Sequence, residues 1–583
     1  MVYWTSDDVV QVGEEKVSIP AENGLNYTVG QTSRRVNLFI PPSVKFLSGK
    51  DSYLQFDLKI NQPDTLHTRL QLDPAGAGVL VQNIRIYDGS RGNLIEEINE
   101  YNQLVVLDSD YNSDESGRGL KALTQGATDY SHVTGGTLGT SKTDLNDLHT
   151  NPYFKAKTDA TQAIPHKGAD ANNTVKCCLP LDKTGVFSGD IFPVMMTDGL
   201  FMEIDLMAAP RVINQVDAVA RFRRTKLNPG FLNREPLVGG NGSIISASNA
   251  SIPGFILKVD NRINAVPSNV PFCVGESIGF CKSTNSASVI TFDAPLLVGQ
   301  INASNNNIQV TITGGDAIAI DAAQDTLSDE NNYVVFSKEI TSKPVEAAKV
   351  TYTVSNVNFI AHQIMFDPSY EQRMLAKSRA GKFIEFDIYS YTNYKNSMLA
   401  SERQATFLIN AQNSKAKALL TIPTDQTVYT SAQMISNTGT YEVTSDSMDT
   451  TLCSNRPGLA GCCDFLSSYQ FQMDGKLVPS RPVSTRKIAT RKSIDAFHVF
   501  ESEKMLANSH IEPKSFVKFM ENFVIGRGFG GSNNGVMDLR GKDLSLILNY
   551  SETTAPTKNK TFNSFVYHVR RVRIRGGMAE VIV

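Results

Sequence analysis

Four segments from the first two thirds of this 583-residue chain return, in the same order, in its last third. The stripe that follows Gly199 aligns without a gap with the stripe that follows Gly541, and Phe359–His362 aligns with Phe565–His568. Two weaker matches precede them, Leu38–Pro41 with Leu420–Pro423 and Tyr87–Gly89 with Met473–Gly475. Recurrence in a fixed order is typical of a repeated structural unit. The sequence therefore predicts a duplicated domain.

The clearest local pattern is the alternation of apolar and polar residues, which indicates half-buried strands. It occurs around Ile84 and in Leu54–Ile60, Leu200–Leu206 and Leu544–Leu548. Glu203 and Asp205 are then expected to face outward. Only 20% of the residues are charged and 41 are glycine, a mixture that suits short strands joined by turns. These patterns predict an all-β fold.

Helix signals are few. Asp367 and Pro368 can serve as an N-cap and a first helical residue, which predicts a helix over 367–378. A second helix is expected over 495–507. The repeat and the first helix together predict the organisation of the chain: an N-terminal arm at 1–30, a first β-domain at 31–366, a helical linker at 367–378 and a second β-domain at 379–583.

The first β-domain is much the longer of the two, and its surplus lies in two blocks. We predict a long loop insertion at about 108–175 and a β-rich insertion at about 214–349. Insertions of this length inside a compact domain are usually functional.

The overall charge and the cysteines narrow the class of protein. The net charge is −3 and no basic tail is present, which argues against a dedicated binder of polyanions. The cysteines are odd in number and sparse, which indicates reduced thiols in an intracellular setting: Cys177, Cys178, Cys273, Cys281, Cys453, Cys462 and Cys463. We expect no signal peptide, and no apolar run reaches the roughly 18 residues of a membrane span.

The candidates for metal or cofactor chemistry are weak. The vicinal cysteines lack zinc-site spacing and are expected to be buried small hydrophobes. His362 and His568 hold equivalent places in the repeat, so we expect a shared packing or hydrogen-bonding role. The glycine-rich run Gly526–Gly531 resembles a dinucleotide loop, but the residues that follow it do not begin a convincing helix. An inter-strand loop is the better interpretation, and we predict no metal, no cofactor and no catalytic residue.

Two charged clusters leave alternatives open. Glu96, Glu97 and Glu100 could suggest the paired carboxylates of a glycoside hydrolase, but the only tryptophan is Trp4, and sugar clefts usually offer stacking aromatic residues. Near the C-terminus, a strand would place three arginines on one face, namely Arg571, Arg573 and Arg575. We favour a charged strand edge. Contact with nucleic-acid phosphate is the alternative.

The arrangement resembles the double-jelly-roll major capsid proteins, and is similar to those of virophages and polinton-like viruses. Three segments carry the resemblance: Asn83–Asn102, Phe359–Leu375 and Phe565–Val583. The resemblance covers the whole chain, and the two large insertions depart from the family pattern. It implies two tandem eight-stranded jelly rolls joined by a short helix, with long loop insertions in the first. In that family three chains form a pseudo-hexagonal trimer that tiles an icosahedral shell.

The resemblance also implies partners and a location. The chain is expected to act as the major capsid protein of a double-stranded DNA virus, to assemble inside the infected host cell and to reside in the virion. Its partners would be further copies of itself, penton proteins and minor capsid proteins, with weak contact to packaged DNA left open and no membrane span. The alternatives are a β-sandwich glycan- or receptor-binding protein, such as a lectin or a viral spike, and a jelly-roll enzyme. The duplication favours the non-enzymatic shell protein.

Overall fold

The structure is a computed structural model. It describes residues 11–61, 69–73, 75–112, 121, 124–126, 174–189, 191–216, 234–236, 244–246, 254–259, 277–282, 285–290, 296–304, 307–314, 333–337, 347–426, 434–435, 459–463, 465–485, 496–511, 513, 522–529, 535–551, 555–556 and 559–582.

The first two thirds of the chain contain a sandwich of two antiparallel sheets. Sheet A1 has the order β1 (Gln11–Pro20), β19 (Thr351–Phe366), β4 (Phe46–Asn61) and β8 (Thr174–Pro180), and β2 (Asn26–Val29) also pairs with β19. Sheet B1 has the order β3 (Arg34–Ile40), β9 (Leu200–Leu206), β6 (Val81–Asp88) and β7 (Leu94–Asn99). If β2 is left aside, A1 holds the first, last, third and sixth strands along the chain, and B1 holds the second, seventh, fourth and fifth. This order is that of a jelly roll.

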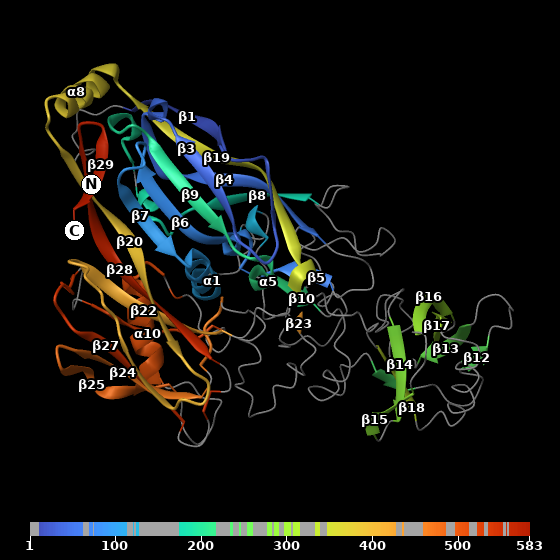
Figure 1. Ribbon diagram of the computed structural model, residues 1–583. Coiled ribbons are helices and arrows are strands. Elements are labelled where there is room, and N and C mark those ends of the chain that lie inside the picture. The colour runs from blue at the N-terminus through green and yellow to red at the C-terminus, as the bar shows by residue number, and fades with distance from the viewer. Residues whose placement is uncertain are drawn as a thin grey trace.

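The last third of the chain repeats this topology. Sheet A2 has the order β20 (Ile384–Met398), β28 (Lys560–Arg575), β22 (Ala416–Asp425) and β26 (Ile525–Gly528), and β29 (Met578–Ile582) also pairs with β28. Sheet B2 has the order β21 (Gln404–Leu408), β27 (Leu544–Tyr550), β24 (Leu466–Met473) and β25 (Lys476–Ser484). The strand order again runs first, last, third, sixth and second, seventh, fourth, fifth. The predicted all-β fold of two tandem jelly rolls is confirmed, and Figure 1 shows the two sandwiches one above the other.

Three of the four sequence matches fall on equivalent strands. The stripes after Gly199 and Gly541 are β9 and β27, and the segments ending at His362 and His568 lie in β19 and β28. The Asp-Gly turns join equivalent hairpins, β6–β7 and β24–β25. The match between Leu38–Pro41 and Leu420–Pro423 is wrong, because it aligns β3, the second strand of its jelly roll, with β22, the third. Both segments are apolar and precede a proline, which is too little to distinguish neighbouring strands.

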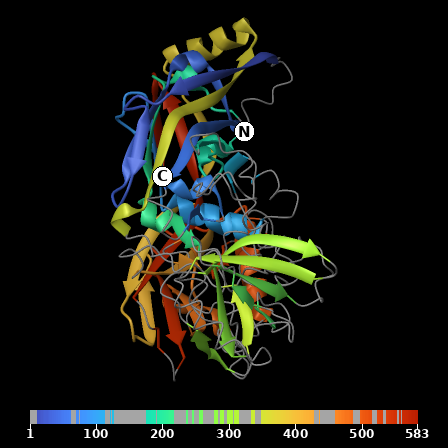
Figure 2. The ribbon, with the colours of Figure 1, turned by 90° about the vertical axis from the view of Figure 1, so that its right-hand side faces the viewer.

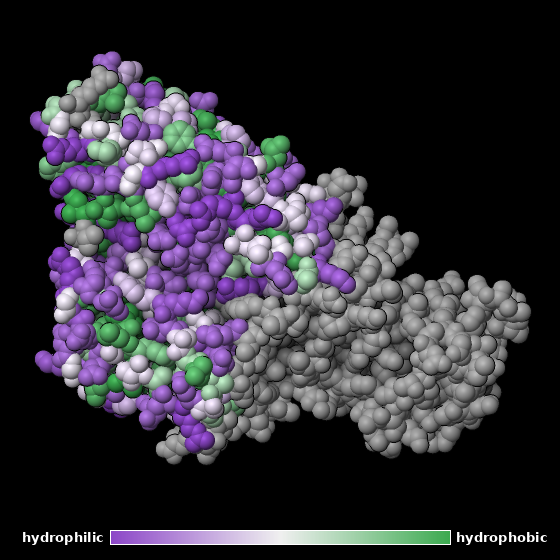
Figure 3. All heavy atoms as spheres, viewed as in Figure 1, coloured by the Kyte–Doolittle hydropathy of each residue, from purple (hydrophilic) through white to green (hydrophobic). Residues whose placement is uncertain are grey.

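The predicted alternation places the core between the sheets. Leu54, Phe56 and Leu58 of β4 are buried, as are the inward residues of β9 and β27. The outward residues of sheet B1 are charged and pair with one another. Arg35 and Arg85 each donate to Asp205, at 2.8 and 2.9 Å. Figure 3 shows the resulting hydrophilic face over this sheet.

The predicted helices are confirmed with small shifts of their ends. They are α8 (Pro368–Arg379), where the Asp367 carboxylate accepts a hydrogen bond from the Ser369 hydroxyl, and α10 (Ala496–Asn508). The sequence missed α1 (Tyr101–Tyr111), which lies between β7 and β8 as α10 lies between β25 and β26. The predicted loop at 108–175 is therefore corrected, because 108–111 end α1 and 174–175 begin β8. Buried Leu104, Leu107 and Tyr111 hold the helix against the sandwich.

Shorter elements complete the described residues. Besides α4 (Gly185–Ser188) and α5 (Ala209–Val212), 3-10 turns lie at Pro42–Val44, Ala77–Leu80, Val194–Met196 and Ala347–Lys349. A small sheet joins β10 (Ile213–Val216) to β5 (Arg69–Leu72) and β23 (Met434–Ile435).

The predicted β-rich insertion contains a separate antiparallel sheet, which lies to one side of the sandwiches (Figures 1 and 2). Its strands are β11 (Arg234–Pro236), β12 (Ile244–Ser246), β13 (Gly254–Val259), β14 (Ser277–Lys282), β15 (Asn285–Ile290), β16 (Leu296–Ser304), β17 (Asn307–Gly314) and β18 (Tyr333–Ser337). The order is β11-β18-β14-β16-β17-β13-β12, and β15 also pairs with β14. The predicted limits of the two β-domains and of the β-rich insertion stay predictions.

The predicted arm at 1–30 is wrong for its second part. β1 pairs along β19 from Gln11 to Pro20, and β2 pairs with the start of the same strand. The sequence contains the reason, because Val17 and Ile19 alternate with polar residues and Ile19 is buried. Residues 1–10, which include Trp4, lie outside the described residues.

A small apolar gap remains between sheets A1 and B1. It measures about 10 Å³ and its lining is entirely apolar, including Val36, Phe56, Ile204 and Val354. A gap of this size holds at most one water molecule, and its lining offers that water no polar partner. Side chains around it therefore lack some packing contacts.

Adding one methyl group to this gap is expected to stabilise the first jelly roll. Val354→Ile should raise the free energy of unfolding by about 0.5–1 kcal/mol, since one buried methylene is worth about 0.8 kcal/mol. The measurement is urea unfolding followed by circular dichroism. The control is Val572→Ile, at a buried position of β28 away from the gap, which should give no gain. Equal losses in both variants would contradict the prediction.

Candidate functional site: the seam between the jelly rolls

The first and second jelly rolls share a continuous apolar contact, which we call the seam. It is the region where β7 and α4 meet β20, β28 and β29. One face of β20 packs against the first jelly roll, and the rings of Phe386 and Phe192 meet edge to face at 5.4 Å. The buried residues of both sandwiches form one cluster. The seam therefore joins the two sandwiches through a core as well as through the linker helix.

A buried carboxylate joins three elements at the centre of the seam. Glu96 of β7 is fully buried and accepts hydrogen bonds from the backbone N–H groups of Gly185 and Val186, at 2.7 and 3.1 Å. The Ser390 hydroxyl of β20 donates to the same carboxylate at 2.5 Å. Burial raises the pKa of Glu96, while the donated hydrogen bonds and the nearby Arg570 charge act in the opposite direction. The carboxylate thus ties β7 and α4 of the first jelly roll to β20 of the second.

The backbones come very close beside this carboxylate. A Cβ atom at Gly185 would lie 2.4 Å from the Tyr389 carbonyl oxygen and 3.0 Å from Ile388 Cβ. Both atoms belong to β20 of the second jelly roll. Glycine is therefore required at this position by the approach of the other sandwich.

A methyl group at this contact is expected to force the seam apart. Gly185→Ala should lower the free energy of unfolding by roughly 2–3 kcal/mol, in the range measured for overpacked sites. The matched control is Gly189→Ala at the other end of α4, where the nearest atom to a new Cβ is 3.3 Å away and belongs to α4 itself. The measurement is the melting temperature of each variant, compared with that of the unaltered protein. A shift of the same size in both would show that the seam tolerates the methyl group.

Side chains of the second jelly roll cover the open edge of β7. The Arg570 guanidinium donates to the Ile95 carbonyl at 3.2 Å, and the Asn393 amide donates to the Asn99 carbonyl at 3.5 Å. Arg570 also donates to the Thr392 hydroxyl at 3.2 Å, and His568 shares that hydroxyl at 2.8 Å. Burial and then the Arg570 charge lower the pKa of His568 to about 3. Polar side chains thus take the place of a neighbouring strand.

A second polar contact lies at the end of α1. The Tyr111 hydroxyl donates to the Asn522 carbonyl at 2.7 Å, and the Asn522 amide donates to Asp110 at 2.8 Å. The Asn522 side-chain oxygen also accepts from the Gly461 N–H group at 2.8 Å. Buried Asn522 therefore connects Asp110 and Tyr111 of α1 to Gly461. At the other end of the molecule, the β28–β29 turn meets the first jelly roll, where Asp198 N–H donates to the Gly577 carbonyl at 2.9 Å.

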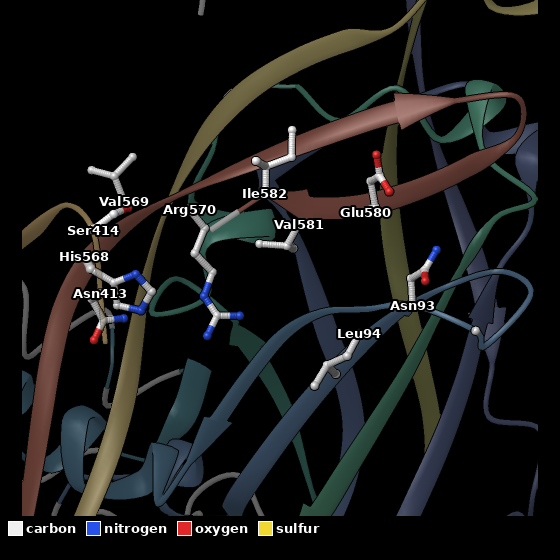
Figure 4. Close-up of a pocket in the computed structure, with 11 residues that line it drawn as sticks. Asn93, Leu94, Asn413, Ser414, His568, Val569, Arg570, Glu580, Val581 and Ile582 are labelled. Carbon is white, nitrogen blue, oxygen red and sulfur yellow. The ribbon is translucent and has the colours of Figure 1, made fainter. Parts of the chain in front are cut away.

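The seam opens to the surface in a cavity of about 500 Å³ (Figure 4). Its lining comes from the β6–β7 turn, from the loop before β22, from β28 and from β29: Gly92, Asn93, Leu94, Asn413, Ser414, His568, Val569, Arg570, Glu580, Val581 and Ile582. Both jelly rolls contribute to it, so its shape depends on the seam.

The acidic cluster considered from the sequence does not form a paired-carboxylate site. Alternation along β7 buries Glu96 in the seam and turns Glu97 to the outer face, where it pairs with Arg85 at 2.9 Å. Glu100 immediately precedes α1 and has a left-handed backbone conformation. Its carboxylate lies 3.7 Å from the Arg211 guanidinium and 3.9 Å from the Lys395 ammonium group.

The C-terminal arginines lie on one face of β28, as predicted, but that strand is not an edge. β20 pairs on one side of β28, and β22 and β29 pair on the other. The expectation of a charged strand edge is therefore wrong. Arg571 binds Asp387 at 2.8 Å, and Arg573 binds Glu385 at 2.6 Å. The acidic residues of β20 thus neutralise two of the three arginines.

The other candidates have structural surroundings. Cys177, Cys462 and Cys463 are buried, and Cys178 is half-buried. Both histidines of the repeat hydrogen-bond to the first strand of their own jelly roll, His362 to Glu14 and His568 to Thr392. Gly526 and Gly528 lie in β26, which corrects the expected loop. A Cβ at Gly526 would lie 2.1 Å from the Leu419 carbonyl oxygen, so the glycine serves strand packing.

Within the described ranges, no group of three or more metal-binding side chains is found. No helix in that part of the chain is long and apolar enough to cross a membrane. The residues that do form the seam were missed by sequence reasoning. Gly185, Ser390 and Asn522 are common residue types with no distinguishing spacing, and nothing in the sequence separates Arg570 from the arginines that follow it.

Known proteins that are similar to this chain are found among solved structures. No family model matches the sequence, and the search of curated proteins finds no match. Among solved structures, the chain is similar to PBCV-1 VP54 as fitted into a reconstruction of the virophage Sputnik, with 10% identity, 100% of each chain covered and a TM-score of 0.44. It is also similar to the Faustovirus major capsid protein, with 9% identity, 98% of this chain and 92% of that chain covered and a TM-score of 0.44. The mavirus major capsid protein gives 9% identity, 100% and 93% coverage and a TM-score of 0.34. The last two of these structures are named as viral major capsid proteins.

Proposed function

We propose that this chain is a major capsid protein that self-assembles as pseudo-hexagonal homotrimers into the icosahedral shell of a double-stranded DNA virus. The observation that carries the proposal is the pair of jelly rolls with one strand order, joined through a shared core. Jelly rolls are common in viral shells. Two of them in one rigid chain provide a repeated building block.

The symmetry of the repeat suggests how such a block assembles. Three chains around a threefold axis bring six similar sandwiches together, which approximates a hexagon. Closed cyclic symmetry of this kind is the usual form of a homo-oligomer. The seam matters for this assembly because it fixes the orientation of the two jelly rolls within one chain. A contact with a neighbouring copy through one jelly roll then also orients the other jelly roll.

Exposed apolar side chains support association with further copies. Such residues occur on the second jelly roll and on the β28–β29 hairpin beside it: Phe383, Tyr389, Leu399, Leu408, Leu477, Phe500 and Met578. Figure 3 shows hydrophobic patches on the left side of the molecule, over β20 and β29 and over β22 and β27. Apolar patches on a soluble chain often mark contact surfaces.

Two further points concern the partners of the chain and its lack of catalytic activity. We propose a non-enzymatic role, with penton and minor capsid proteins as neighbours. Contact with packaged DNA would be weak, because Arg571 and Arg573 already hold carboxylates and only Arg575 of that face has no ion pair among the described residues.

The test is the oligomeric state of the purified protein. Size-exclusion chromatography with light scattering should give a stable species of three times the chain mass, and negative-stain images should show a six-lobed outline or hexagonal sheets. A monomer or dimer at every salt and protein concentration would overturn the proposal. If such a species bound glycans on an array, the β-sandwich binding protein would take its place.

A further inference from the structure

The seam cavity is lined by an arginine that forms no ion pair with the part of the chain that the structure describes. Arg571 and Arg573 on the same strand each form an ion pair, whereas Arg570 forms none with the described residues. Its two recorded contacts are to neutral groups, the Ile95 carbonyl and the Thr392 hydroxyl. Glu96, the buried carboxylate of β7, feels the Arg570 charge but is already held by three donors of its own. Arg570 is thus a half-buried cation at a cavity wall.

The Arg570 guanidinium keeps donors available for a ligand. A guanidinium carries five N–H groups in a planar fork, and the two recorded contacts use one on each terminal nitrogen. Figure 4 shows the side chain extending into the space between His568 and Leu94. An oxyanion in that space can accept charge-assisted hydrogen bonds from the remaining donors. The contacts to Ile95 and Thr392 hold the fork in place beforehand.

The other walls select the rest of the ligand. Leu94, Val581 and Ile582 offer apolar surface, and Leu94 is 39% exposed although it is a large aliphatic residue. Asn93, Asn413 and Ser414 add neutral polar groups at the rim. A volume of about 500 Å³ is in the range of small-molecule sites, roughly 300–1,000 Å³. The lining thus combines one cationic anchor with an apolar wall.

The charge of the cavity favours a single negative charge on the ligand. Glu580 lies on the wall, where Arg573 is its partner at 3.8 Å. His568 is buried and already engaged by Thr392. A dianion would meet one cation and one carboxylate, whereas a monoanion needs only the Arg570 fork.

We propose that the seam cavity binds a small amphiphilic monocarboxylate, with its carboxylate on Arg570 and its apolar chain along Leu94, Val581 and Ile582. The ligand would touch both jelly rolls and so stabilise the seam. This site goes beyond the proposed shell function and can be tested on the isolated protein in any oligomeric state.

The first test is calorimetric titration with octanoate. Octanoate should bind the unaltered protein with one site per chain, and Arg570→Gln should weaken it at least about tenfold, the loss of one charge-assisted contact. The matched control is Arg575→Gln, five residues along the same strand and outside the cavity lining, which should bind as before. Octanol and octyl phosphate should bind more weakly than octanoate.

A second variant separates binding from stability, because Arg570 also holds the edge of β7. Ser414→Phe fills the cavity and leaves Arg570 and its two contacts in place. It should abolish octanoate binding and the rise in melting temperature that octanoate causes, with the melting temperature of the free protein little changed. The proposal is overturned if octanoate does not bind at millimolar concentration, if octanol binds equally well, or if either cavity variant binds octanoate normally. A change in oligomeric state with Arg570→Gln and no octanoate binding by the unaltered protein would assign the cavity to a second copy instead.

Discussion

Glu96→Ala is expected to lower the free energy of unfolding by roughly 3–5 kcal/mol, the usual cost of breaking a buried, fully hydrogen-bonded charged site. The substitution removes the acceptor of three hydrogen bonds, from Gly185, Val186 and Ser390, all within buried surroundings. It also leaves a void where β7, α4 and β20 meet. Because the carboxylate joins elements of both jelly rolls, we expect the two sandwiches to lose cooperativity as well as stability.

The neighbouring residue provides the control. Glu97 points to the opposite face of β7 and pairs with half-exposed Arg85, so Glu97→Ala should cost about 1 kcal/mol or less. Glu96→Gln should fall between the two, since an amide keeps one acceptor oxygen but directs an N–H₂ group at a donor. The measurement is urea unfolding, monitored by far-ultraviolet circular dichroism. One transition is expected for the unaltered protein and two for Glu96→Ala. Equal effects of Glu96→Ala and Glu97→Ala would contradict this role of the seam.

The strands could be predicted because their signal is local. In β9 and β27 the apolar residues recur at every second position, and a sheet with one buried face requires that pattern. The repeat added topology, since two stripes in the same order indicate equivalent strands. The arm failed for the opposite reason. Its strand β1 is an edge with mostly exposed residues, so only Val17 and Ile19 carry the period.

The seam could not be predicted because it depends on contacts between distant residues. Glu96 and Ser390 are 294 positions apart, and nothing in the sequence distinguishes Glu96 from Glu97. The two roles follow from which face of β7 each residue occupies and from what the other sandwich places there. Arg570 differs from Arg571 in the same way, since one step along β28 moves the side chain from the outer face to the seam cavity. The chemistry of these residues comes from packing rather than from spacing.

Acidification is expected to destabilise the protein steeply between pH 6.5 and pH 5. Burial lowers the pKa of His498 to about 3, and burial together with the Arg570 charge does the same for His568. An unfolded histidine has a pKa near 6.5. Below that value the unfolded chain takes up protons that the folded chain refuses, so stability falls as the pH falls, until the folded pKa of about 3 is reached.

The size of this effect and its assignment can be measured together. Each buried histidine should remove on the order of 1.4 kcal/mol per pH unit, or about 4 kcal/mol for both at pH 5. His498→Gln and His568→Gln should each flatten the slope by about half, and the double variant should remove most of it. Carboxylates with lowered pKa values, such as Asp108 and Asp387, add their own loss only at lower pH, and Glu96, whose pKa burial raises, acts in the opposite sense, so the slopes of the histidine variants make the assignment. A slope that persists in the double variant would show that other groups take up the protons. His498 lies in the core of the second jelly roll against Phe523 and His568 lies at the seam, so unequal effects would show which of the two sites contributes more to the pH dependence.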